Sequence, residues 1–363
     1  MQTVPRPEIA VSADLDFRFL FKYCVNSRKH TGLLPLLSVS GRQESSSTQG
    51  IMNGFRSLGT TSHQVSKLGV GTWSWGDKSI WGYGKGYSDA DLREAFKSSI
   101  ASGISFFDTA ELYGYGKSEE LLGQFISESR ATVFVATKYF PYPWRLDTKA
   151  VLSALRRSLK RLGLPSVDLY QIHWPFHLLS IPSMMAALTE AVGEGLARAV
   201  GVSNYSADQM RRAVDALAKN KIPLASNQVE YSLLHRSPEE DGVLDACKDA
   251  GVTLIAYSPM AMGMLTGKYS VRNLPAGFRR LRYRSLNFSE FGGLMDLLAR
   301  IGEAHGGKTH PQVALNWLIY KEAFPIPGAK NAQQASQNAG ALGWSLTHEE
   351  VDSLHEAACR VTN

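Results

Sequence analysis

Four side chains with complementary proton chemistry each stand at the end of a short apolar segment: Asp108 and Tyr113 after residues 104–107, Lys138 after residues 132–137, and His173 at the end of residues 167–173. A tyrosine phenol has a pKa of about 10 and keeps its proton at neutral pH. A neighbouring ammonium favours the phenolate and therefore eases release of that proton. An aspartate holds the ammonium in place, and a histidine can orient a substrate oxygen. The set suits proton transfer to a carbonyl oxygen.

Taken singly, these residues have simpler explanations. A lone Lys or Asp at a strand end is more often a solvated rim residue, and a lone His is more often a structural group. Their convergence favours catalysis. The set holds neither a nucleophile–base pair nor a metal cluster, so the electrons would come from a nicotinamide hydride. His173 and His177 have a spacing that binds metal on a helix, but they follow a strand and flank Pro175, so no metal site is predicted.

Eight short apolar segments alternate with amphipathic ones and predict the strands: residues 68–73, 104–107, 132–137, 167–173, 197–202, 225–229, 253–257 and 324–327. Their continuous apolarity is typical of parallel strands buried on both faces. Such alternation gives an open doubly wound sheet or a closed barrel. No dinucleotide-binding Gly-x-Gly-x-x-Gly follows the first strand, and no phosphate loop occurs. We therefore predict an α/β protein, a single-domain (β/α)8 TIM barrel whose site lies at the carboxyl ends of the strands.

Helices are predicted between the strands, in several cases from end signals. Ser88 with Asp91 is a capping box, and Gly163 follows the end of another helix. The predicted helices cover residues 88–99, 118–127, 148–162, 182–192, 207–218, 242–250, 293–304, 311–320, 332–339 and 347–358.

Composition limits the possible partners. The 363 residues carry a net charge of +6, and no apolar run reaches the ~18 residues that span a membrane. An arginine cluster at residues 279–284 is typical of a solvated loop, with a phosphorylated ligand as the alternative and nucleic acid disfavoured. Cys24, Cys247 and Cys359 stand too far apart in sequence for a disulfide framework. We expect a small-molecule carbonyl substrate, no nucleic acid, no membrane, and a monomer or weak oligomer.

Residues 1–60 differ from the rest and predict a disordered leader or possible transit peptide, which leaves residues 61–363 for the barrel. Residues 1–49 contain seven Ser, six Lys or Arg and four acids. Transit peptides are Ser-rich and basic but poor in acids, so Glu8, Asp14 and Asp16 count against targeting. The alternatives are organelle import and a disordered extension of a cytoplasmic protein.

Three segments resemble the signatures of the aldo-keto reductase family. They are residues 107–114 (FDTAELYG), residues 136–138 (ATK) and residues 168–174 (DLYQIHW). The resemblance implies a catalytic tetrad of Asp108, Tyr113, Lys138 and His173, with Tyr113 as the general acid in NADPH-dependent reduction of an aldehyde or ketone to an alcohol.

The resemblance also implies an extended NADPH across the barrel mouth. It assigns cofactor contacts to Ser203, Asn204, Gln228, Tyr257, Ser258, Leu265, Gly267, Lys268, Gly328, Lys330, Gln334, Gln337 and Asn338. Tyr257 would stack on the nicotinamide, and Lys330 would bind the 2′-phosphate. Many members carry Arg where Gln334 stands, which leaves preference for NADPH over NADH open.

Residues 222–228 and 340–346 resemble the plant plastid branch of the family, which includes pyridoxal reductases, and so indicate a chloroplast protein. The hairpin that plugs the barrel in this family is echoed only weakly, by residues 58–65. A cofactor-bound regulatory subunit resembling potassium-channel β subunits remains an alternative, because those subunits keep the tetrad. The variable loops at residues 75–87, 139–144 and 174–181 would choose the substrate.

Overall fold

The computed structural model describes residues 54–176, 178–270 and 272–362. Its main feature is an eight-stranded parallel sheet in the order β10-β9-β8-β7-β6-β5-β4-β3. The strands are β3 (Val70–Gly71), β4 (Phe106–Asp108), β5 (Phe134–Tyr139), β6 (Val167–Ile172), β7 (Ala197–Ser203), β8 (Leu224–Glu230), β9 (Thr253–Tyr257) and β10 (Phe324–Pro325). The sheet closes where Gly71 bridges Gly328 and donates its N–H to the Pro327 oxygen at 3.1 Å. The predicted (β/α)8 barrel is confirmed.

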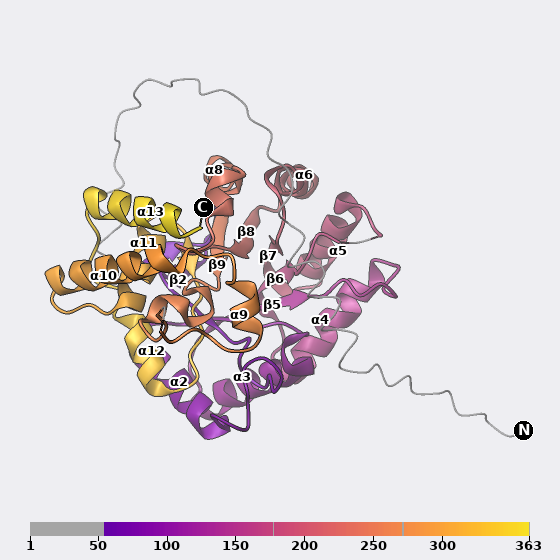
Figure 1. Ribbon diagram of the computed structural model, residues 1–363. Coiled ribbons are helices and arrows are strands. Elements are labelled where there is room, and N and C mark those ends of the chain that lie inside the picture. The colour runs from indigo at the N-terminus through magenta and orange to yellow at the C-terminus, as the bar shows by residue number, and fades with distance from the viewer. Residues whose placement is uncertain (1–53, 177, 271, 363) are drawn as a thin grey trace, which may run out of the picture. The chain divides into compact units, whose positions relative to one another are not determined.

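Helices surround this sheet (Figure 1). They are α2 (Asp89–Ala101), α3 (Lys117–Ser129), α4 (Lys149–Leu162), α5 (Ile181–Gly193), α6 (Ala207–Ala218), α7 (Ser237–Glu240), α8 (Val243–Asp249), α9 (Phe278–Arg282), α10 (Phe288–Ala304), α11 (His310–Tyr320), α12 (Ala332–Ala339) and α13 (His348–Thr362), with 3₁₀ turns η2 (Tyr113–Gly116) and η3 (Ala261–Thr266). None of the helices in the described ranges is both long enough and apolar enough to cross a membrane.

A two-stranded hairpin precedes the barrel. Strand β1 (Phe55–Ser57) pairs antiparallel with β2 (Gln64–Ser66). Leu58 and Val65 are fully buried in one cluster with side chains from the barrel interior, including Phe106. The hairpin that the sequence indicates only weakly is therefore present and packs into the barrel.

The hairpin also bears on where the barrel domain begins. Strand β1 lies within the stretch that the sequence assigns to the leader, residues 1–60. Residues 1–53 of that stretch lie outside the described residues, so the leader itself remains a prediction.

A larger apolar cluster lies between the strands and the helices. Helix α6 shows how the helices join this cluster: Ser206 and Gln209 form a capping box at its start, and Met210, Ala213 and Leu217 are buried. Such a buried apolar stripe fixes each helix against the sheet. The carboxyl ends of the strands are thereby held at one mouth of the barrel.

Candidate active site

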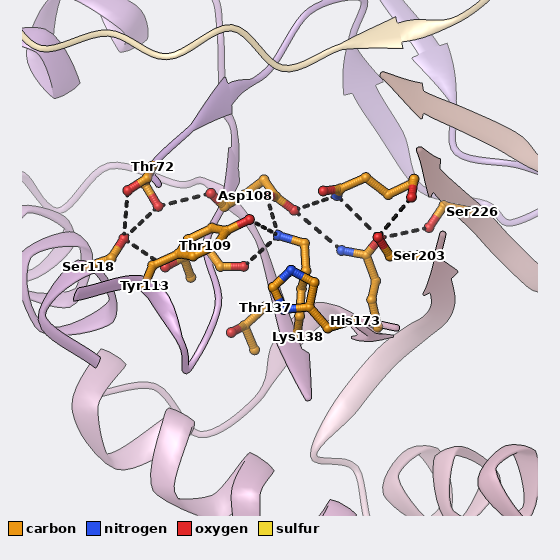
Figure 2. Close-up of polar contacts among 12 residues, drawn as sticks. Thr72, Asp108, Thr109, Tyr113, Ser118, Thr137, Lys138, His173, Ser203 and Ser226 are labelled. Carbon is orange, nitrogen blue, oxygen red and sulfur yellow. Dashed lines mark hydrogen bonds and ion pairs between the residues drawn. The ribbon is translucent and has the colours of Figure 1, made fainter. Parts of the chain in front are cut away.

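The four side chains selected from the sequence meet at this mouth (Figure 2). Asp108 is the last residue of β4, Lys138 lies in β5, and His173 follows β6. Tyr113 begins the turn η2, which follows β4 after a short loop. The parallel pairing of β4, β5 and β6 brings these segments side by side.

The Lys138 ammonium is fully buried and uses all three of its donor positions. It forms an ion pair with Asp108 Oδ2, donates to the Thr109 backbone oxygen at 2.9 Å, and donates to the Tyr113 hydroxyl oxygen at 3.2 Å. Burial lowers the pKa of Lys138, but Asp108 and Tyr113 outweigh it and the net shift is upward. The amine is therefore held as a cation against the phenol.

This geometry decides where the Tyr113 proton points. An ammonium has no lone pair, so the phenol oxygen can only accept from Lys138 and its own proton must point elsewhere. Burial raises the pKa of Tyr113, and the charge of Lys138 opposes that rise. The group keeps its proton at neutral pH while its conjugate base is stabilised by a neighbouring charge.

Asp108 is fixed by amides from two further strands. Its Oδ1 accepts from Gln228 Nε2 at 2.8 Å and from Gln171 Nε2 at 3.3 Å. Gln171 Oε1 in turn accepts from Ser226 Oγ at 3.3 Å. A buried carboxylate needs such partners. Gln171 was not predicted as a site residue, although a polar residue inside an apolar strand was a signal for it.

His173 presents an uncharged imidazole. Burial and then the charge of Lys138 hold its pKa well below the usual value. Its ring packs edge-on against Tyr113 at 5.8 Å and against Phe140 at 5.7 Å between centroids. Its Nδ1 is buried and has no hydrogen-bond partner among the described residues. A neutral ring held in this way can orient a substrate oxygen without competing for the proton.

A hydroxyl cluster supports the loop that carries the acid and the phenol (Figure 2). Ser118 Oγ lies 2.7 Å from Thr72 Oγ1 and 2.9 Å from Thr109 Oγ1. Thr72 Oγ1 also donates to the Asp108 backbone oxygen at 2.9 Å. The start of α3 is thus tied to β3 and β4.

The residues predicted to hold the nicotinamide end lie at the ends of β7, β8 and β9. Asn204 Nδ2 donates to Ser203 Oγ and to the His173 backbone oxygen, each at 3.0 Å. The Tyr257 hydroxyl donates to Asn204 Oδ1 at 3.1 Å, which fixes its ring at the mouth. Gln228 lies near the end of β8 and donates its amide nitrogen to Asp108 at 2.8 Å, and its contact with the carboxamide stays a prediction.

The loop after β9 contains the predicted cofactor contact Ser258 and the predicted pyrophosphate segment, Leu265, Gly267 and Lys268. Several of its residues adopt left-handed backbone conformations, among them Ser258 (φ 49°), Met262 (φ 53°) and Gly267 (φ 80°). Successive turns of this kind direct N–H groups toward one side and form concavities that suit anions. Leu265 is fully buried and anchors the loop, while Lys268 is exposed.

Lys330 lies among aromatic rings and other cations. Its Nζ donates to the Trp81 backbone oxygen at 3.1 Å and lies 4.6 Å from the Tyr87 ring centre. The Arg279 guanidinium lies over the Trp81 ring at 5.5 Å. Burial and then the charge of Arg279 lower the pKa of Lys330 to about 8; Asp77 opposes this fall, and Lys268 adds to it.

These three cations lack an ion-pair partner among the described residues, although the charge of Asp77 also acts on Lys330. Within residues 54–176, 178–270 and 272–362, none of Lys330, Arg279 and Lys268 belongs to an ion pair. Arg282 of the predicted arginine cluster, by contrast, pairs with Glu230 at 2.6 Å. A cluster of cations without ion-pair partners, two of which lower the pKa of the third, fits a phosphate group. Arg279 belongs to the arginine cluster for which a phosphorylated ligand was the alternative, and Trp81 lies in a loop predicted to choose the substrate; neither was predicted as a cofactor contact.

The remaining predicted cofactor residues lie around α12. The Gln334 side chain accepts from the Lys330 N–H at 2.9 Å, and Asn338 Nδ2 donates to the Gly328 oxygen at 3.2 Å. Gln337 is half-buried one residue before Asn338. The segment therefore packs around Lys330, and the set as a whole fits an extended dinucleotide with a phosphate at this end.

For metals, no group of three or more His, Cys, Asp or Glu side chains gathers in the described part of the chain. His177, the second member of the histidine pair noted in the sequence, lies outside the described residues.

Aromatic side chains gather on the loops after β5 and β6. Tyr142 stacks on Trp144 with centroids 4.6 Å apart, and Trp174 stacks on Phe176 at 5.5 Å. Trp73 lies 6.4 Å from Tyr113, the candidate proton donor. Loops with flat rings at the barrel mouth are suited to a planar apolar molecule.

Comparison with known proteins is consistent with this geometry. Residues 67–358 match the model of the Aldo/keto reductase family. The chain is 42% identical over 309 residues to "Pyridoxal reductase, chloroplastic" of Arabidopsis thaliana, covering 81% of this chain and 83% of that protein. It is 34% identical to "Aldo-keto reductase yakc [NADP(+)]" of Schizosaccharomyces pombe, covering 75% and 84%.

A solved structure agrees as well. The thermostable aldo-keto reductase Tm1743, in complex with the inhibitor epalrestat, matches with a TM-score of 0.67 and 31% identity over 84% of this chain and 99% of that one. Fold, family model and relatives point the same way: the chain belongs to the aldo-keto reductase family of oxidoreductases, enzymes that reduce carbonyl groups.

Proposed function

We propose that this protein reduces a planar aromatic aldehyde to the alcohol with NADPH, and that Tyr113 donates the proton. The contact set of Lys138 carries the proposal. With its three donors on Asp108, Thr109 and Tyr113, the ammonium leaves the phenol proton free to meet a carbonyl oxygen in the pocket.

The cofactor, when bound, supplies the hydride, and the protein's own groups manage the proton. Transfer of the Tyr113 proton leaves a phenolate, which the Lys138 charge stabilises at hydrogen-bond distance. Asp108 keeps that charge in place through its buried ion pair. Neutral His173 hydrogen-bonds the substrate oxygen and orients it toward Tyr113.

The cation group supports NADPH as the cofactor. Lys330 and Arg279 would bind the 2′-phosphate that distinguishes NADPH from NADH, with Lys268 nearby in the predicted pyrophosphate segment. The relative from S. pombe is named for NADP(+), which agrees with this choice.

An aromatic aldehyde as the substrate is supported by the rings at the mouth and by one relative. The stacked pairs at Tyr142–Trp144 and Trp174–Phe176 offer flat apolar faces. The relative from A. thaliana is named a pyridoxal reductase, and pyridoxal is a planar aromatic aldehyde. Pyridoxal is therefore the first substrate to test.

A plastid location is also proposed. The same relative is named chloroplastic, and residues 1–49 are rich in Ser and basic residues. In plant cells, a fluorescent protein fused to the full chain should enter plastids, and the same fusion starting at Gly54 should stay in the cytosol. A cytosolic full-length fusion would contradict this.

The activity is tested by NADPH oxidation with pyridoxal, substituted benzaldehydes and small aliphatic aldehydes. We expect turnover, fastest with the planar aromatic aldehydes. Tight NADPH binding without turnover of any aldehyde would overturn the proposal and favour the regulatory-subunit alternative.

A further inference from the structure

A buried ion pair joins the two loops that flank the candidate site, and none of the steps above uses it. We propose that Glu111 and Arg145 are positioning residues, which hold Phe140 against His173 and anchor the aromatic wall formed by Phe140, Tyr142 and Trp144. This rests on the proposed reduction of an aromatic aldehyde. Its consequence is selectivity: loss of the pair should slow all substrates through His173, and should slow planar aromatic substrates by a further factor, because only these would touch the aromatic wall.

The pair is well formed and shielded from water. Arg145 Nη1 bonds Glu111 Oε1, and Arg145 Nη2 bonds Glu111 Oε2 at 2.9 Å. The Arg145 side chain is 12% exposed and the Glu111 side chain is 7% exposed. A two-pronged guanidinium–carboxylate contact fixes both distance and orientation, and burial removes the competition from solvent that weakens surface pairs. The loop after β4, which carries Tyr113, is thereby linked to the loop after β5.

Glu111 and Arg145 both form hydrogen bonds with the backbone of Phe140. The Phe140 N–H donates to Glu111 Oε1 at 2.7 Å, and Arg145 Nη1 donates to the Phe140 backbone oxygen at 2.8 Å. The Phe140 ring is buried and meets the His173 imidazole edge-on. Because His173 makes no hydrogen bond through its buried Nδ1 in the described part of the chain, ring packing is a main constraint on its orientation. Loss of the grip on Phe140 would loosen the imidazole that orients the substrate.

Arg145 also organises the outer rings. Its guanidinium carbon lies 4.9 Å from the centre of the Tyr139 ring and 4.9 Å from that of the Tyr142 ring. Tyr142 in turn packs on Phe140 at 4.7 Å and stacks on Trp144. A planar cation suits this place because it can bond in its plane while its faces contact rings. The wall that a planar substrate would touch is thus built around one guanidinium.

Arg145→Lys is the informative variant. It keeps a positive charge for buried Glu111, so the fold should survive, but an ammonium has neither the two-pronged geometry nor a flat face. We expect the ratio of kcat/KM for pyridoxal or a benzaldehyde to kcat/KM for a small aliphatic aldehyde to fall about tenfold or more, because small misplacements in a site cost large factors in rate. The melting temperature and the NADPH affinity should stay close to those of the wild type. Arg156→Ala, which breaks the exposed pair with Glu194, is the matched control and should leave the ratio unchanged.

An unchanged selectivity ratio in Arg145→Lys would overturn the proposal, whether both activities stay normal or fall together, because a purely structural pair affects all substrates alike. Hydrogen exchange gives a readout that needs no turnover. The Phe140 amide, which donates to Glu111, should exchange faster in Arg145→Lys than in the wild type. Equal exchange rates would contradict the proposal that the ion pair holds Phe140 in place. If the wild type reduces no aldehyde, the proposed function fails, and the hydrogen-exchange result alone tests whether the Glu111–Arg145 pair holds Phe140 in place.

Discussion

The affinity for NADPH should depend on pH through Lys330. Burial and two neighbouring cations lower its pKa to about 8, so the side chain is mostly charged at pH 7 and mostly neutral at pH 9. A group with that pKa is about nine-tenths protonated one unit below it and about one-tenth protonated one unit above it. If only the charged form binds the 2′-phosphate, the apparent Kd for NADPH should rise about tenfold from pH 7 to pH 9, in proportion to the loss of the competent form.

Two variants make this prediction specific. Lys330→Met removes the charge at every pH and should weaken NADPH at pH 7 by about 1.5–3 kcal/mol, the range for hydrogen bonds to charged groups. Lys330→Arg keeps its charge throughout, so its affinity for NADPH should stay flat between pH 7 and pH 9. NADH lacks the 2′-phosphate and should bind all three proteins with little dependence on pH.

The assay is a fluorescence titration of each nucleotide into each protein at several pH values. The wild-type curve for NADPH should approach that of Lys330→Met as pH rises. Equal weakening of NADPH and NADH by Lys330→Met would show that Lys330 does not bind the phosphate. A wild-type affinity for NADPH that stays constant up to pH 9 would refute the reasoning from the lowered pKa.

Two further predictions concern the hairpin and His173. Leu58→Ala should lower the free energy of unfolding by about 2–5 kcal/mol, because it leaves a cavity where the hairpin packs into the barrel. A chain starting at Gly54, by contrast, should keep the stability and the turnover of the full chain. Denaturant unfolding measures the stability of both variants, and a shortened chain that aggregates would contradict the second expectation. The pKa of His173 lies well below its usual value, so the imidazole stays neutral as the pH falls through about 6.5. The rate of hydride transfer should therefore not change with pH in this range. A fall in rate near pH 6.5 that disappears in His173→Gln would contradict this expectation.

Much of the fold was predictable because its local signals agree. The predicted bounds of β9, α6 and α12 match those of the structure. Each of the two helices directly follows a capping residue, Ser206 or Asn331. Helix α10 begins at Phe288 rather than at the predicted residue 293. Gly292 and Gly293 lie inside the helix, where the Asn287 cap and the burial of Phe291 outweigh the low helix propensity of glycine.

Other parts carry too weak a local signal. The strands β1 and β2 have three residues each, too few to show alternation. Strand β10 ends at Pro325, two residues before the predicted end; Ile326 still donates to the Ala256 oxygen at 3.1 Å, and Pro327 then has no N–H to continue the ladder. The short helices α7 and α9 were also not predicted.

Some residues of the candidate site could likewise be predicted from the sequence, and others could not. Asp108, Tyr113, Lys138 and His173 could be found because each stands at a strand end and carries distinctive chemistry. The Glu111–Arg145 pair joins residues 34 positions apart, and Arg279 approaches Trp81 from the short helix α9, far away in the sequence. Such contacts depend on how loops pack across the mouth, and neither periodicity nor end signals in the sequence record that packing.

The proton donor is the central claim, and Tyr113→Phe tests it most directly. The substitution keeps the ring that packs on His173 and removes only the hydroxyl that Lys138 holds. Single-turnover reduction of pyridoxal at saturating NADPH should slow by at least about a hundredfold, the lower end for loss of a general acid, while NADPH binds as tightly as it does to the wild type. Hydride transfer in Tyr113→Phe at a rate near that of the wild type would contradict the account.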